Sequence, residues 1–145
     1  MAKKPKILSC SENSRTFKVL MPNNWYGEKI HIDGDVITEQ TTKKCDYAFK
    51  VLDEVKTRYA LIYVELKGDD LAQAISQLED TIKYFKDNTH YMGFPKLYAR
   101  VVCSKISPFT NSNLQVRKKT FKEKYKFDLA WQSREGSLTF TSNKD

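Results

Sequence analysis

Residues 59–66 read YALIYVEL, and this run decides the fold. All but one of its residues are apolar, which is typical of a central strand covered on both faces. Residues 69–87 follow after Gly68 and carry apolar side chains at helical spacing. The residues that keep this spacing are Leu71, Ala74, Ile75, Leu78, Ile82 and Phe85. A buried strand followed by an amphipathic helix predicts an α/β domain.

Upstream of this unit, alternation between apolar and polar residues predicts further strands. Residues 45–53 alternate, with Tyr47, Phe49 and Val51 on one face, so we expect one strand there. Residues 28–39 are expected to form a hairpin that turns at the Asp-Gly-Asp of residues 33–35. Residues 1–27 are polar and contain breakers, which predicts an irregular N-terminal segment packed on the domain.

Downstream, residues 97–103 are mostly apolar and are expected to form another strand. Residues 112–125 predict a second, basic helix, and residues 126–141 a closing hairpin around Glu135 and Gly136. This order of strands and helices predicts one domain, residues 1–145, built on a mixed sheet.

Composition narrows the class of protein. The 145 residues are 40% hydrophobic and 30% charged, an ordinary globular balance. No apolar run approaches the ~20 residues that span a membrane, and no secretory signal is visible, so we expect no membrane partner. Cys10, Cys45 and Cys103 form no CxxC pair, which argues against structural zinc or disulfides and favours a reduced, cytoplasmic protein. The net charge of +7 favours a polyanionic partner such as nucleic acid.

The charged end of the central strand is where chemistry is expected. Glu65 and Lys67 alternate onto one face of it, and burying charge is costly unless the charge is paired or binds a metal. If residues 54–57 form the loop to the preceding strand, paired residues have numbers that sum to 111, so Asp46 lies opposite Glu65. Two opposed carboxylates repel each other, and a divalent cation between them would remove the repulsion.

Asp46, followed by Val64-Glu65-Leu66-Lys67 and an amphipathic helix, resembles the PD-(D/E)xK nuclease superfamily. The resemblance covers residues 28–103. It implies an α/β, restriction-endonuclease-like fold with a mixed central sheet flanked by helices. It further implies that Asp46 and Glu65 bind Mg²⁺ or Mn²⁺, with the backbone carbonyl of Leu66 completing the metal shell. Lys67 would position or activate the attacking water, and the product would carry a 5′-phosphate.

Some positions depart from that pattern or leave alternatives open. Cys45 stands where the family name has proline, and either Glu28 or Glu39 could be the further upstream acid of many members. Gln73 and Gln77 lie on the predicted helix as possible accessory residues. However, residue 81 is threonine, where some subfamilies have tyrosine, so we interpret both glutamines as solvated helix residues.

A basic segment follows the last predicted central strand. Its aromatic residues are expected in the core, whereas its charges predict a phosphate-contacting surface. The predicted nucleic-acid-binding residues are Lys105, Arg117, Lys118, Lys119, Lys122, Lys124 and Lys126.

The sequence therefore predicts a metal-dependent nuclease with DNA as the favoured substrate. Specificity would come from loops, from a homodimer or from a larger complex, and a two-fold dimer would suit cutting both strands. One alternative is a non-catalytic nucleic-acid-binding module on the same fold. Another is a subunit whose basic face meets an acidic protein.

Overall fold

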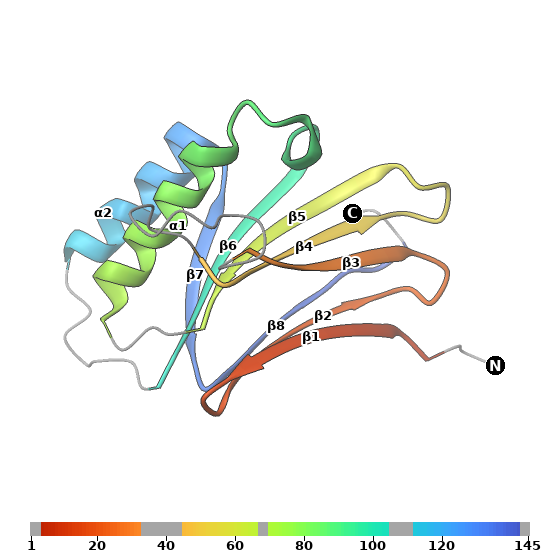
Figure 1. Ribbon diagram of the computed structural model, residues 1–145, viewed down its shortest axis with the longest axis horizontal. Coiled ribbons are helices and arrows are strands. Elements are labelled where there is room, and N and C mark those ends of the chain that lie inside the picture. The colour runs from red at the N-terminus through yellow and green to blue at the C-terminus, as the bar shows by residue number, and fades with distance from the viewer. Residues whose placement is uncertain (1–3, 33–44, 67–69, 105–111, 143–145) are drawn as a thin grey trace.

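A computed structural model of the protein describes residues 4–32, 45–66, 70–104 and 112–142 (Figure 1). Strands outnumber helices in the described residues. The strands and helices in chain order are β1 (Lys6–Glu12), β2 (Arg15–Met21), β3 (Tyr26–His31), β4 (Tyr47–Leu52), β5 (Arg58–Glu65), α1 (Leu71–Phe85), the short 3₁₀ turn η1 (Thr89–Tyr91), β6 (Lys96–Cys103), α2 (Ser112–Thr120), the π-helical turn η2 (Phe121–Tyr125), β7 (Asp128–Ser133) and β8 (Glu135–Thr139).

The larger sheet has five strands in the order β3-β4-β5-β6-β7. β5 lies at its centre, as the apolar run of residues 59–66 predicts. β3, β4 and β5 are antiparallel neighbours, whereas β6 and β7 run parallel to β5. Parallel neighbours need a long connection, and α1 and α2 lie in the two connections. The prediction of a mixed α/β sheet is therefore confirmed.

Both helices pack on one face of this sheet (Figure 1). α1 begins after Asp70, whose carboxylate accepts a hydrogen bond from the Gln73 N–H at 3.1 Å and so caps the helix. Its apolar stripe is buried against β5 and β6 as the spacing predicts. The buried residues of α1 are Ala74, Ile75, Leu78, Thr81, Ile82 and Phe85.

The other face of the large sheet is covered by a second sheet of three strands, in the order β1-β2-β8. Phe17, Val19 and Met21 of β2 pack there against Phe49 and Val51 of β4, and all five are almost fully buried. The expectation of a sheet flanked by helices is therefore correct for one face only. In the described residues, a small sheet takes the place of helices on the second face.

The predicted irregular segment 1–27 is wrong, because β1 and β2 form an antiparallel hairpin there. Asn13 and Ser14 make its turn with φ values of 49° and 66°, a left-handed backbone that asparagine tolerates well. Prolines and polar residues near its ends obscure the alternation of buried side chains in β2.

The predicted closing hairpin is also wrong. β7 and β8 are separated by Arg134 alone, which has a φ of 66°, and they join different sheets. β7 extends the large sheet, whereas β8 pairs in parallel with β2. A one-residue connection is too short for a hairpin loop, so the chain changes sheet instead. Of the predicted hairpin 28–39, β3 includes residues 28–31, and residues 33–39 lie outside the described residues.

Candidate active site

The two predicted carboxylates lie at the ends of neighbouring central strands. Asp46 immediately precedes β4, and Glu65 is the last residue of β5. Their residues are 2% and 0% exposed, respectively. Buried carboxylates are uncommon in proteins unless they are paired, hydrogen-bonded or bound to a metal, so this location demands a chemical reason.

The predicted register between β4 and β5 is confirmed along most of the ladder. Pairs from Tyr47 with Val64 to Val51 with Ala60 have numbers that sum to 111. The predicted loop is wrong at its start, because an irregularity after Val51 pairs Leu52 with Arg58.

Asp46 itself lies just beyond this ladder. Its N–H donates to the carbonyl of Val64 at 3.1 Å, and Val64 is already the ladder partner of Tyr47. The regular pairing therefore ends before the expected Asp46–Glu65 pair, and the two residues are neighbours at the strand ends rather than ladder partners.

The Asp46 side chain reaches across to the chain that follows β5. Its Oδ2 accepts a hydrogen bond from the backbone N–H of Leu66 at 2.8 Å, in a fully buried position. Hydrogen bonds to a charged acceptor are stronger than neutral ones. This bond ties Asp46 to the residue between Glu65 and the predicted lysine.

The pKa of the Cys45 thiol is affected by burial and by both carboxylates. Burial raises the pKa of its thiol well above the ordinary value, and the negative charges of Glu65 and Asp46 raise it further. Such a thiol stays protonated and is unsuited to act as a nucleophile.

Thr81 is a site residue that the sequence analysis assigned no role. Its Oγ1 accepts a hydrogen bond from the Cys45 N–H at 2.8 Å and donates one to the Gln77 carbonyl at 2.8 Å. Through this pair of bonds, α1 fixes the backbone directly before Asp46. The one signal in the sequence is a polar residue within the apolar stripe of the helix.

The remaining predicted site residues are not gathered around the carboxylates. Lys67, Glu39 and Lys105 lie outside the described residues. Glu28 is exposed on β3 and pairs with Lys50. It lies three residues before His31, the end of β3 that pairs with Tyr47. On α1, Gln73 is exposed, as interpreted from sequence, and Gln77 is half-buried.

The donor chemistry at this edge fits a hard divalent cation. Carboxylate oxygens are the ligands that Mg²⁺ and Mn²⁺ prefer, and Asp46 and Glu65 supply two of them. Within the described ranges, no group of three or more His, Cys, Asp or Glu residues is close enough to hold a metal. The carbonyl of Leu66 and water would have to complete the shell.

The basic residues of α2 and η2 face several directions. Arg117 is directed to α1, where it donates to the Ala72 carbonyl at 2.9 Å and to the Ser76 hydroxyl at 3.1 Å. Lys118 Nζ lies 5.9 Å from the ring centre of Trp131 on β7. Lys119 of α2 pairs with Glu123 of η2 at 3.9 Å.

Three lysines do share one surface, which we call the basic hollow. Lys96, Lys122 and Lys126 line a cavity of about 410 Å³ at the start of β6 and β7, together with Asp128. Lys96 pairs with Ala60, whereas Glu65 pairs with Val101. At about 3.3 Å per residue, the hollow therefore lies about 17 Å along β6 from the carboxylate end.

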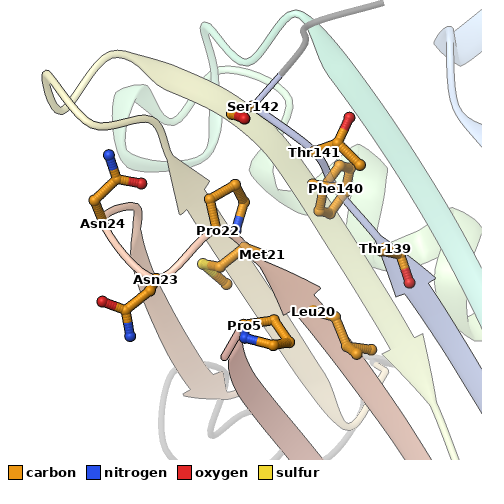
Figure 2. A pocket seen from close by; sticks show the side chains of 10 residues that line it. All are labelled: Pro5, Leu20, Met21, Pro22, Asn23, Asn24, Thr139, Phe140, Thr141 and Ser142. Atoms are coloured by element: carbon orange, nitrogen blue, oxygen red, sulfur yellow. The ribbon is translucent and has the colours of Figure 1, made fainter. Parts of the chain in front are cut away.

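Another cavity, of about 490 Å³, lies where the small sheet meets the turn after β2 (Figure 2). Prolines, asparagines, hydroxyl-bearing and apolar side chains line it, and none of these residues is charged. It therefore offers no group suited to acid–base or metal chemistry.

Comparisons with known proteins leave the family open. No family model matches the chain, and neither curated proteins nor solved structures gave a match. In the part of the chain that the structure describes, no helix has the length and apolar character to cross a bilayer.

Proposed function

We propose that the protein is a metal-dependent nuclease that hydrolyses phosphodiester bonds, with DNA as the favoured substrate. One observation carries the proposal: two buried carboxylates, Asp46 and Glu65, end neighbouring strands at the centre of a mixed sheet. The resemblance of residues 28–103 to the PD-(D/E)xK superfamily assigns catalytic roles to the same two acids.

In this proposal, Asp46 and Glu65 hold Mg²⁺ or Mn²⁺, and the Leu66 carbonyl contributes a further ligand. When bound, the cation would neutralise charge on the phosphate and lower the pKa of the attacking water. The bond from the Leu66 N–H orients Asp46, and Thr81 fixes the backbone before it. Lys67 would add a positive charge beside the nucleophile. The basic hollow would bind backbone phosphates on the same substrate.

Cleavage assays test this directly. The purified protein is incubated with plasmid, single-stranded DNA and RNA, each with Mg²⁺, with Mn²⁺ and with EDTA. The variants Asp46→Asn, Glu65→Gln and Lys67→Ala are expected to lose metal-dependent cleavage. Glu54→Gln, an exposed acid in the β4–β5 turn, is the matched control and should cleave normally. Cleavage that survives in all three site variants would show that the active site is elsewhere.

A non-catalytic nucleic-acid-binding module is the second candidate. The observation that favours it is that the Asp46 carboxylate already accepts a buried bond from Leu66 and so has a structural use. Binding that is salt-sensitive and metal-independent, without cleavage by folded protein, would support this module. Failure to bind any nucleic acid at low salt would instead favour an acidic protein partner.

A further inference from the structure

A cavity with aromatic walls opens beside the last turn of α1. Its volume is about 370 Å³, and it lies between that turn, η1, the start of β6 and the end of η2. We call it the aromatic slot and define it by the rings of Tyr63, Phe85, Tyr91 and Phe127. All four residues are at most 8% exposed. Neither Asp46 nor Glu65 lines it, so the proposed nuclease makes no use of it.

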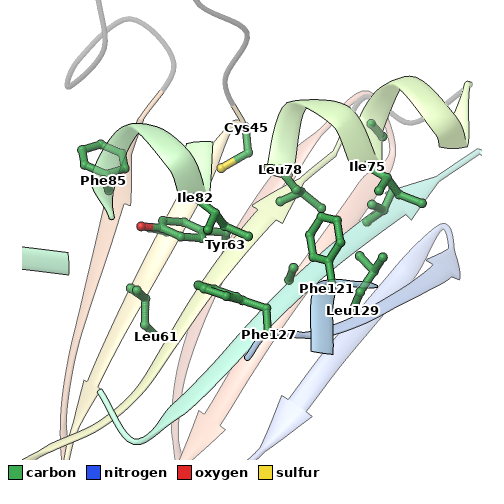
Figure 3. Packing of buried hydrophobic residues seen from close by; sticks show 14 of the residues in the cluster. Cys45, Leu61, Tyr63, Ile75, Leu78, Ile82, Phe85, Phe121, Phe127 and Leu129 are labelled. Carbon is green, nitrogen blue, oxygen red and sulfur yellow. The ribbon is translucent and has the colours of Figure 1, made fainter. Parts of the chain in front are cut away.

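The rings of the slot are nearly parallel. The Tyr63 ring lies 5.6 Å from that of Phe127 at an interplanar angle of 15°, and 6.3 Å from that of Phe85 at 19°. Phe85 and Tyr91 stack at 4.0 Å and 29°. Figure 3 shows Tyr63 between Phe85 and Phe127. The four rings therefore pack on one another as one aromatic set, and its outer edges and faces border the cavity. Such a border favours a flat aromatic ring over a globular aliphatic group.

Charge around the slot is unevenly distributed. Burial raises the pKa of the Tyr63 and Tyr91 phenols, so both are neutral at pH 7. Lys86 and Lys124 are exposed residues that line the slot. Glu79 does not line the slot, although it accepts a hydrogen bond at 3.0 Å from the hydroxyl of Tyr125, which does. The residues lining the slot therefore combine apolar rings with positive charge and include no acid.

We propose that the aromatic slot binds a planar aromatic anion, its ring packed against the aromatic set that borders the cavity and its anionic group paired with Lys86 and Lys124. A volume of about 370 Å³ lies within the range of small-molecule sites and has room for one or two fused rings. A free aromatic carboxylate and a mononucleotide share this chemistry. The inference does not depend on nuclease activity.

Titration calorimetry with three related probes tests the proposal on the unmodified protein. Naphthalene carboxylate carries both the flat ring and the charge, naphthalene methanol lacks the charge, and decalin carboxylate lacks the flatness. Naphthalene carboxylate is expected to bind about tenfold tighter than either of the others. Equal affinity for all three, or no binding of naphthalene carboxylate, would overturn the proposal without any variant being needed.

Paired variants locate the site. Lys86→Met with Lys124→Met is expected to weaken binding of naphthalene carboxylate about tenfold. Lys18→Met with Lys83→Met removes the same charge from exposed lysines that lie outside the slot and outside the basic hollow, and should leave the affinity unchanged. Similar losses in both double variants would mean that the probe senses only net charge, and the proposal would fail.

A third comparison uses Met92, which lines the slot and is 47% exposed. Met92→Trp should occupy the slot and weaken binding, whereas Met92→Leu should not. Displacement of naphthalene carboxylate by adenosine monophosphate would identify a nucleotide as the natural class. If this nucleotide cannot displace the probe, a free aromatic acid is the class. Unaltered binding to folded Met92→Trp would place the probe elsewhere and contradict the proposal.

Discussion

Thr81 shows how much of the candidate site depends on single hydrogen bonds. Its hydroxyl is fully buried and accepts the N–H of Cys45, the residue before Asp46. A buried N–H that loses its acceptor costs the free energy of its desolvation. This bond joins α1 to the backbone directly before Asp46 and so helps to set the position of Asp46 relative to the helix.

We therefore expect Thr81→Val to lower the free energy of unfolding by about 1–3 kcal/mol, measured by urea denaturation. Valine keeps the shape of threonine but leaves the Cys45 N–H without its acceptor. Thr81→Ser keeps the hydroxyl and is the control, with a smaller loss. If the proposed nuclease is correct, cleavage should fall in Thr81→Val and recover in Thr81→Ser. Equal stability of Thr81→Val and the parent would contradict the structural role.

Cys10 gives a pH-dependent prediction. Burial raises the pKa of its thiol from 9.0 to about 12. Since the folded protein holds this proton more tightly than the unfolded chain does, the stabilisation is complete below pH 9 and is lost as the pH rises from 9 towards 12.

The test compares the parent with Cys10→Ala by urea denaturation at pH 8 and at pH 10. From the linkage relation, the stability advantage of the parent should shrink by about 1.4 kcal/mol between these pH values. The variant serves as the control for every other alkaline titration, including those of the tyrosines. A difference that does not change with pH would show that the Cys10 thiol is not shielded from water.

Some features of the site were predictable at this scale and others were not. The burial of Glu65 follows from its place in an apolar run, and the register near Asp46 follows from hairpin pairing. Thr81 was not predictable, because its partner Cys45 is 36 residues away and only the folded chain brings them together. The deviation of Asp46 from the ladder is likewise a local backbone detail that alternation cannot reveal.

At the scale of elements, Arg117 joins the two helices. Beyond its bonds to Ala72 and Ser76, its guanidinium lies 3.7 Å from the Glu79 carboxylate. Its side chain is 27% exposed, so solvent screens this pair only in part. Arg117, which the sequence predicts to contact phosphate, therefore joins α2 to α1.

Arg117→Met should reduce stability by about 1 kcal/mol and speed amide hydrogen exchange in α2 more than in the large sheet. The methionine keeps much of the aliphatic stem but removes every donor. Lys118→Met on the same helix is the control, because its charge lies over Trp131 rather than against α1. Exchange that is unchanged in Arg117→Met would show that apolar packing alone holds α2.

The elements also show where local patterns fail. β5 and β6 were predictable from their apolar runs, and α1 was predictable from the helical spacing of its apolar residues. The joining of β8 to β2 was not, since it is a parallel pairing between the two ends of the chain. Two strands that follow each other closely in sequence are most simply predicted to form a hairpin. In the folded protein, β8 instead pairs with β2 of the small sheet, whose core contains Phe17 and Val19.

At the scale of the whole molecule, the basic hollow and the two buried carboxylates are separated along the large sheet. The carboxylates end β5 on one side, and the basic hollow lies about 17 Å away near the start of β6. A nucleic acid that contacts both regions would have to extend across several phosphates, because successive phosphates of one strand are about 3.4 Å apart along a duplex. The proposed nuclease therefore requires a substrate longer than a dinucleotide.

A net charge of +7 would attract a polyanion to no particular surface of the molecule. The basic hollow instead predicts that a polyanion binds at one defined surface. We expect Lys96→Ala with Lys122→Ala and Lys126→Ala to reduce the salt dependence of duplex DNA binding. Each lost phosphate contact lowers the slope of log K against log salt by about 0.9, so the slope should become smaller by about 2 to 3. Fluorescence anisotropy over a series of salt concentrations measures it.

The control for that prediction removes the same charge elsewhere, by changing the exposed Lys4, Lys18 and Lys83 to alanine. Because counterion release counts only phosphates that are contacted, this triple variant should keep the parent slope. Equal slopes in the two triple variants would mean that binding follows net charge and that the hollow is not a phosphate surface. A reduced slope confined to the Lys96, Lys122 and Lys126 variant would instead fix the path of the substrate, which must then run along β6 towards Glu65 for cleavage to occur.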